Sequence, residues 1–270
     1  MKYPISVQSF EYLREQKYLY VDKTDKVYDL AQKHVCFLCR PRRSGKSLLL
    51  STLEAYFLGK KNLFEGLKME LLEHEWLAYP VFHLDFNGIN FKQKGALEDA
   101  LNTFVSSAEK IYGKDPYAQN FNYGYRFAYA LHQAFMQTGQ RCVVLIDEYD
   151  KPLLDVLGEE SEAVHREILK GFYSVFKSSD PDLRFVLLTG VTKFLQISVF
   201  NGFNQPFDIS MNSDYEALCG ITEEELHTVL DGAVADLANK LGATETQMYL
   251  ALKTLYDGYH FSPAIMCCSL

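Results

Sequence analysis

The sequence has no apolar stretch long enough to cross a bilayer, and no segment that joins a charged start, an apolar middle and a small-residue cleavage site. These absences argue against a membrane helix and a secretory signal, so we expect a cytoplasmic protein without membrane contact. Basic residues are in the minority, with 27 Lys and Arg against 35 Asp and Glu and a formal net charge of −8. That field repels DNA, so any nucleic-acid contact would need a local basic patch.

Cysteine is also sparse, with 6 scattered residues. Cys36 and Cys39 have C-x-x-C spacing, but they fall in an apolar run of strand length, where residues three apart face opposite sides. We therefore expect packed strand residues and no metal or redox pair. His83 and Asp85 share one face of another predicted strand, but the sequence identifies no third metal ligand for them.

Glycine is missing from the first position of an otherwise recognisable phosphate-binding loop. The pattern G-x-x-x-x-G-K-[ST] is met by residues 40–47, except that Arg40 stands in the place of the first glycine. The apolar run Val35–Cys39 precedes this loop, and residues 47–58 form an amphipathic helical pattern that Gly59 ends. Strand, loop and helix in this order place main-chain amides and the positive end of a helix dipole at a bound anion.

This order predicts how a nucleotide would be held. Lys46 would reach the β- and γ-phosphates, and the Ser47 hydroxyl would bind Mg²⁺. The remaining phosphate contacts are expected from the loop amides and the first helical turn, namely Arg43, Ser44, Gly45 and Leu48. The alternative is a solvated basic loop, in which Arg40, Arg42, Arg43 and Lys46 lie in water or on a nucleic-acid backbone.

A second segment, Cys142–Glu148, supports the nucleotide interpretation. Val143–Ile146 is a continuous apolar run typical of a buried parallel strand, and two carboxylates follow at its end, where α/β sheets bind ligands. Asp147 would hold Mg²⁺, directly or through water, and Glu148 would polarise the attacking water as general base. An Asp-Glu pair can also be a helix N-cap or a solvated turn, but the upstream Gly-Lys-Ser favours a joint site.

A third apolar run, Leu183–Gly190, ends in Thr189, which is the expected sensor of the γ-phosphate or water, with Lys193 as the charged alternative. The segment Pro80–Phe86 is a further strand between loop and carboxylates. We therefore expect that the Asp-Glu strand does not adjoin the phosphate-loop strand. This arrangement and Glu148 indicate a P-loop NTPase of the additional-strand class, with a parallel sheet flanked by helices.

The chain resembles the predicted AAA-ATPase-like family of bacterial proteins over nearly its whole length. The matching motifs, in order, are residues 10–14, 20–24, 40–53, 145–153, 189–194 and 256–261. The resemblance accounts for Arg40, because the family's loop commonly reads R-P-R-R-F-G-K-S. Ser44 stands where phenylalanine is typical, which removes an apolar contact beside the loop.

Members of this family often continue into a domain resembling PD-(D/E)XK nucleases. Residues 264–270 do not match that continuation, so the resemblance leads to the hypothesis of a truncated form of a longer, nuclease-fused protein. A nuclease-like reading frame downstream in the DNA would test this hypothesis.

The C-terminal part has helical patterns. Thr222 and Glu225 form a capping box, followed by one apolar stripe from Leu226 to Leu237 and by a second helix through Met248 and Leu255. We expect an ATPase domain over residues 1–212 and a helical, lid-like subdomain over 213–270, which closes over ATP or converts the nucleotide state into movement.

These patterns predict an enzyme that hydrolyses Mg²⁺-ATP and acts on an unknown protein or nucleic-acid partner. Two alternatives stay open: a nucleotide-gated switch with negligible hydrolysis, and a nucleic-acid-associated protein of a mobile element. A P-loop kinase is disfavoured, because the sequence indicates no second-substrate pocket. Arg126, Arg166, Arg184 or a partner subunit could supply an arginine finger, which leaves a homo-oligomer open.

Overall fold

The computed structural model describes residues 2–4, 6–117, 122–193, 206–256, 259–260 and 266–268. Its centre is a five-stranded parallel sheet with the strand order β2-β3-β4-β1-β5. The strands are β1 (Val35–Cys39), β2 (Val81–Asp85), β3 (Cys142–Asp147), β4 (Leu183–Gly190) and β5 (Phe207–Asp208). The predicted α/β class and parallel sheet are confirmed.

The central strands β3 and β4 are buried along almost their whole length, which is why nearly all of their residues are apolar. Alternate residues of each strand enter two different cores. Phe37, Val144 and Val186 belong to one, whereas Leu38, Leu145 and Leu187 belong to the other. Cys36 and Cys39 likewise pack on opposite faces, which confirms the prediction of packed strand residues.

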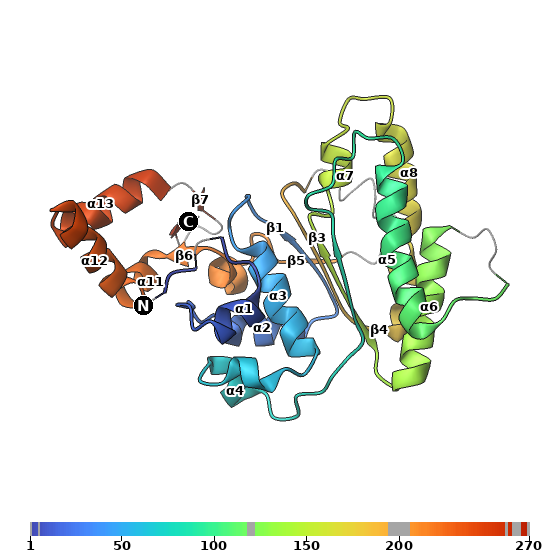
Figure 1. Ribbon diagram of the computed structural model, residues 1–270, viewed down its shortest axis with the longest axis horizontal. Coiled ribbons are helices and arrows are strands. Elements are labelled where there is room, and N and C mark those ends of the chain that lie inside the picture. The colour runs from blue at the N-terminus through green and yellow to red at the C-terminus, as the bar shows by residue number, and fades with distance from the viewer. Residues whose placement is uncertain are drawn as a thin grey trace.

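Helices cover each face in a separate layer (Figure 1). One layer holds α1 (Phe10–Glu15), α2 (Thr24–Ala31), α3 (Lys46–Phe57) and α4 (Lys68–Leu72), with the short helix η1 (Lys61–Phe64). The other holds α5 (Ala96–Tyr112), α6 (Tyr123–Thr138), α7 (Lys151–Leu154), α8 (Glu162–Tyr173) and α9 (Val175–Ser178), and η2 (Asp180–Asp182) leads into β4. The result is a three-layer helix–sheet–helix sandwich.

The strand order brings β4 between β1 and β3. As expected, the phosphate-loop strand does not adjoin the Asp-Glu strand. The separating strand is β4, however, and the strand at residues 81–85 lies at the sheet edge. Sequence order could not show this, because β4 follows β3 in the chain and inserts beside β1 only when the sheet assembles.

The C-terminal part begins with η3 (Ser213–Leu218) and β6 (Ile221–Thr222), followed by α11 (Glu223–Thr228), α12 (Asp231–Leu241) and α13 (Glu245–Tyr256). The capping box of Thr222 and Glu225 is present. The stripe predicted as one helix is divided between α11 and α12, and Val229 and Leu237 are exposed. Strands β7 (Tyr259–His260) and β8 (Met266–Cys268) form with β6 a small antiparallel sheet that the sequence patterns did not predict.

Some residues of the sequence patterns lie outside the described part of the chain: Phe194, Asp257, Gly258, Phe261 and residues 264, 265, 269 and 270. Among the helices that the structure describes, none has both the length and the apolar character needed to cross a membrane.

Candidate functional site

The loop between β1 and α3 has the backbone of a tight anion-binding turn. Gly45 caps α3 in the left-handed region with φ of 96°, and the non-glycine residue Arg43 also has a positive φ of 66°. Glycine adopts this conformation without a steric penalty, whereas Arg43 is strained there. Two left-handed residues turn the chain sharply between strand and helix, so that the first amides of α3 face the loop.

Lys46 lies inside this loop with only 5% of its surface exposed. Its ammonium donates hydrogen bonds to the carbonyl oxygens of Arg40 (3.1 Å) and Pro41 (3.0 Å). Both acceptors are neutral, so the positive charge of the ammonium is held in the loop without a contacting carboxylate among the described residues. Such a charge is suited to an anionic ligand.

Asp147 is the meeting point of the three sequence segments. One of its carboxylate oxygens accepts a hydrogen bond from the Ser47 hydroxyl at 2.5 Å, and the other accepts one from the Thr189 hydroxyl at 2.5 Å. Asp147 and Thr189 are both buried, with 2% and 0% exposure. The structure therefore unites residues from the phosphate loop, β3 and β4 that are up to 142 positions apart.

The register of the sheet explains this meeting. Leu38 of β1 is paired with Thr189 of β4, and Ile146 of β3 is paired with Leu188. The carboxyl ends of β1, β4 and β3 consequently lie at one edge of the sheet, and polar residues that follow each strand converge there.

Glu148 follows Asp147 in a left-handed backbone conformation with φ of 52°. Its N–H donates to the Asp147 carboxylate at 3.0 Å, and its own side chain is half-buried. Burial raises the pKa of Glu148, the Lys46 ammonium opposes this, and the Asp147 charge reinforces it, so that the pKa lies above its ordinary value. A positive φ at a residue other than glycine is strained, and such strain often accompanies functional sites.

Asp150 is a buried carboxylate for which the sequence patterns suggested no role. One oxygen accepts hydrogen bonds from the N–H groups of Val191 (2.9 Å) and Thr192 (2.7 Å) and from the Thr192 hydroxyl (3.0 Å). The Tyr149 hydroxyl donates to the Thr192 carbonyl at 2.8 Å. The turn after β3 is thus hydrogen-bonded to Val191 and Thr192, which directly follow β4. In the sequence, Asp150 could have been found as an acidic residue two positions after Glu148.

Lys193 lies away from Asp147. Its ammonium forms an ion pair with Asp208 at 2.8 Å, and its side chain is 44% exposed. Of the two sensor candidates at the end of β4, Thr189 contacts the Asp147 carboxylate and Lys193 contacts the end of β5.

Arg40 is buried, with 1% exposure, and does not lie on the surface. Its guanidinium donates to the carbonyl oxygens of Ser210 and Tyr215. The alternative prediction of a solvated basic loop is therefore wrong for Arg40. Arg42 and Arg43 are exposed. The composition of the loop could not reveal this, because the partners of Arg40 are main-chain carbonyls 170 and 175 positions away.

The loop offers hydrogen-bond donors to a ligand. In the described part of the chain, the N–H groups of Ser44 and Gly45 have no acceptor, and the buried hydroxyl of Ser44 has no partner. Together with Lys46, these donors fit a polyphosphate.

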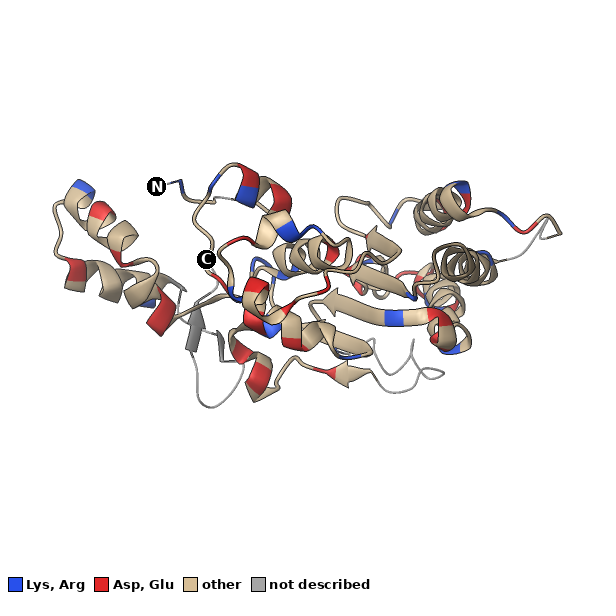
Figure 2. Cartoon of the chain, turned by 90° about the horizontal axis from the view of Figure 1, so that it is seen from below, with Lys and Arg blue, Asp and Glu red and all other residues tan. Residues whose placement is uncertain are grey.

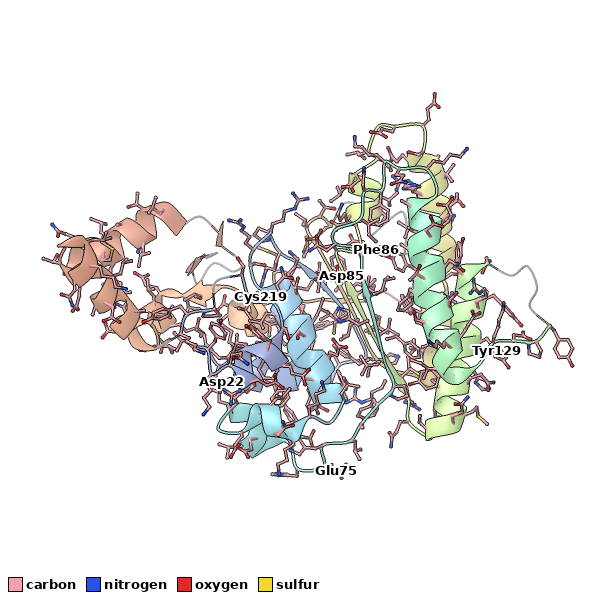
Figure 3. The ribbon with its side chains drawn as sticks, in the orientation of Figure 1. Asp22, Glu75, Asp85, Phe86, Tyr129 and Cys219 are labelled. Carbon is pink, nitrogen blue, oxygen red and sulfur yellow. The ribbon has the colours of Figure 1, made fainter. Side chains whose placement is uncertain are left out.

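Asp22 and Thr24 of the N-terminal motif connect helices. Asp22 accepts hydrogen bonds from the Thr24 N–H (2.9 Å) and hydroxyl (2.7 Å) and from the Lys68 N–H (2.9 Å), and the Thr24 hydroxyl accepts from the Met69 N–H (3.0 Å). Figure 3 shows Asp22 at the level of α2, below Cys219. Asp22 and Thr24 therefore join the start of α2 to the start of α4.

Asp85 ends β2 beside the site. Its Cα is paired in register with that of Asp147, and its side chain is exposed (Figure 3). His83, two residues earlier, pairs with Glu54 of α3 at 2.9 Å. No cluster of three or more His, Cys, Asp or Glu side chains that could hold a metal occurs among the described residues.

Comparison with known families gives a match over most of the chain. The pattern of the family described as "Predicted AAA-ATPase" covers residues 4–200, which include the loop, Asp147, Glu148 and Thr189. The chain belongs to this predicted AAA-ATPase family. The family resemblance noted in the sequence is confirmed over residues 4–200, and the motif at residues 256–261 lies outside the match.

A relative of this predicted AAA-ATPase is an "Uncharacterized protein in vnfD 5'region" from Azotobacter chroococcum mcd 1. The two are 40% identical over 231 residues, which are 84% of this chain and 44% of the relative. The chain thus spans less than half the length of that protein.

The three arginine-finger candidates of the predicted AAA-ATPase have other contacts. Arg126 pairs with Glu109 of α5, and Arg166 pairs with Glu162 within α8. Arg184 is near the start of β4, at the sheet end opposite Thr189. Arg126 also donates to Asn102 and Ser106 of α5, and Arg184 donates to residues 32 and 33, which follow α2.

Proposed function

We propose that this protein binds and hydrolyses Mg²⁺-ATP as an ATPase of the additional-strand class. The observation that carries the proposal is the convergence on Asp147, whose two oxygens contact Ser47 of the phosphate loop and Thr189 of β4. A loop lysine, a hydroxyl at the helix start and a strand-end carboxylate are the parts that P-loop NTPases use for nucleotide and metal. The position of β4 between β1 and β3 supports the additional-strand assignment.

Each residue has a distinct role in this proposal. Lys46 would exchange its contacts with the loop carbonyls for phosphate oxygens, and the amides of Arg43, Ser44, Gly45 and Leu48 would bind the same group. Ser47 and Asp147 would hold Mg²⁺, which, when bound, neutralises phosphate charge. A site with one carboxylate and one hydroxyl suits Mg²⁺, because this ion keeps several waters and takes phosphate oxygens as ligands.

Glu148 is the proposed general base. Its pKa is raised by burial and by the neighbouring Asp147 charge, and a more basic carboxylate accepts a proton from water more readily. Thr189 is the proposed sensor, because its hydroxyl contacts the carboxylate that would hold the metal. Lys193 is the weaker candidate, since its ammonium pairs with Asp208.

The C-terminal elements are proposed to respond to the nucleotide. We divide the chain into an ATPase domain over residues 1–212 and a lid-like subdomain over 213–270. The Gly220 N–H donates to the Ser44 carbonyl of the phosphate loop at 2.8 Å, so the beginning of the second part touches the first at the nucleotide site. A change in the loop can therefore move α11 and act on a partner.

The test is phosphate release from Mg²⁺-ATP by the purified wild type and by Glu148→Gln. We expect turnover in the wild type and its loss by at least about a hundredfold in the variant, because a general base contributes about 10²–10⁴-fold. The variant should bind Mg²⁺-ATP as tightly as the wild type, which calorimetry measures.

Equal turnover in both proteins would show that Glu148 is not the base. Binding of ATP by the wild type without turnover would instead support a nucleotide-gated switch, and absence of binding would overturn the proposal. Glu167→Gln is a matched control, because it makes the same chemical change at an exposed glutamate of α8 and should not affect either measurement.

A further inference from the structure

Arg40 connects three segments that surround the phosphate loop. Its N–H donates to the carbonyl of Gly190 at the end of β4 (3.1 Å), and its carbonyl accepts the Lys46 ammonium (3.1 Å). Its guanidinium donates to the carbonyls of Ser210 and Tyr215 (3.4 Å for the latter), which follow β5. One residue thus touches the β4 end, the loop lysine and the 210–215 segment.

The segment that receives the guanidinium is itself held against the sheet. The Ser210 hydroxyl accepts a hydrogen bond from the Cys39 N–H at 2.8 Å, and the Ser210 N–H donates to Asp208 at 2.9 Å. Ser210 is 1% exposed. Arg40 therefore binds to a fixed partner, and the loop main chain is fixed in turn.

We propose that Arg40 is a positioning residue for the phosphate loop, doing through its side chain what the usual glycine does through its backbone. A glycine at this position allows the chain to turn tightly around a phosphate. Here the turn begins at a residue with a side chain, and the guanidinium holds the main chain whose carbonyls accept the Lys46 ammonium. This inference rests on the proposed nucleotide-binding function.

The chemistry of the side chain matters for this role. A guanidinium carries donors on several nitrogens in a fixed plane, so Nη1 and Nη2 can each reach one carbonyl, whereas the donors of an ammonium all belong to one nitrogen, which would have to lie within reach of both carbonyls. In Arg40→Lys, the side chain should contact one of the two carbonyls. In Arg40→Gly, neither carbonyl has this partner, but the usual first glycine of the loop is restored. The three proteins therefore test whether the side chain or the backbone freedom at position 40 sets the affinity.

The experiment is calorimetric titration of wild type, Arg40→Lys and Arg40→Gly with Mg²⁺ and the non-hydrolysable analogue AMP-PNP, at a temperature where circular dichroism shows each to be folded. We expect Kd to rise about tenfold to a hundredfold in Arg40→Gly and by a smaller factor in Arg40→Lys, as for the loss of charged hydrogen bonds. In phosphate release, KM should rise with little change in kcat, because Asp147 and Glu148 are not touched.

Arg14→Lys is the matched control. Arg14 also contacts two main-chain carbonyls, those of Leu63 (2.8 Å) and Glu65 (2.6 Å), but these lie beyond α3, away from the phosphate loop. It should lower the Tm without changing Kd for the analogue. If it raises Kd as much as Arg40→Lys does, general destabilisation explains the effect and the proposal is overturned.

The outcomes separate this inference from the proposed function. If the wild type binds the analogue and Arg40→Gly binds it equally well, glycine suffices and Arg40 has no positioning role. If the wild type does not bind it, the nucleotide-binding proposal itself fails. If Arg40→Gly is unfolded, the comparison of Arg40→Lys with wild type and Arg14→Lys decides, and an unchanged Kd in Arg40→Lys counts against the inference.

Discussion

Two adjacent carboxylates at the end of β3 have different environments. Asp147 is buried and accepts two hydroxyl hydrogen bonds, whereas Glu148 is half-buried and has a raised pKa. The difference arises because Asp147 still belongs to the strand and Glu148 begins the turn with a positive φ. The difference between the two environments supports the two roles proposed for these residues, metal binding for Asp147 and proton acceptance for Glu148.

The raised pKa of Glu148 predicts the acidic limb of the pH profile. A general base must be deprotonated, so kcat/KM, which reports the groups of the free enzyme, should fall as the pH decreases through the Glu148 pKa, and the limb should lie above the pH at which an ordinary glutamate titrates. Phosphate release measured between about pH 4.5 and 8 checks this, since an ordinary glutamate titrates near about 4.3. A rate that stays level down to that pH would contradict the role of Glu148, and Glu148→Gln serves as the control without the group.

At the scale of elements, β4 and the turn after β3 form one unit. Gly190 ends β4 beside Tyr149 and Asp150, and a Cβ at this position would lie 2.5 Å from Tyr149 Cε1 and 2.8 Å from Asp150 Oδ1. The close approach allows Asp150 and Tyr149 to hold the chain at residues 191–192. Glycine is required here by packing, not by an unusual φ.

Gly190→Ala should therefore lower the free energy of unfolding by about 1–3 kcal/mol, as expected for overpacking of a rigid site. Urea unfolding followed by circular dichroism measures this. Gly232→Ala is the matched control, because a Cβ at Gly232 in α12 meets no atom within 4 Å and alanine favours a helix, so stability should stay level or rise by up to about 1 kcal/mol. If the two substitutions changed the free energy of unfolding equally, the contact with Tyr149 would not limit the size of the residue at position 190.

At the scale of the whole molecule, the net charge does not attract an anionic ligand toward the candidate site. The formal net charge is −8, and Figure 2 shows acidic and basic residues intermixed along the ribbon. In the proposed function, an anionic nucleotide would therefore be recognised by the local donors of the loop, Lys46 among them, and not by an overall positive field. Binding there should stabilise the whole fold, because β1, β3, β4 and α3 all meet at the site.

Mg²⁺-ATP at about a hundred times its Kd should stabilise the folded state by about 2.7 kcal/mol and raise the Tm by about 5–10 °C. Differential scanning calorimetry of the wild type with and without nucleotide measures the shift. Lys46→Ala should lose it, because the phosphates lose their contacting ammonium. An equal shift in Lys46→Ala would show that ATP binds elsewhere or without the phosphate loop.

Sequence alone determined several of the elements and the residues that meet at the candidate site. The strands at residues 35–39 and 183–190, the helix after the loop and the capping box at Thr222 follow from local patterns of apolar and polar residues, which the structure reproduces. Asp147, Ser47 and Thr189 could be named as one site because polar residues after parallel strands converge at one edge of a sheet.

Only the tertiary structure decided how distant segments meet. The place of β4 between β1 and β3, the burial of Arg40 against Ser210, and the contact of Lys193 with Asp208 all depend on contacts between residues far apart in the chain. Local patterns report which face of an element is buried, but they carry no information on which other segment covers it. The partner of a buried charge is therefore set by the assembled fold.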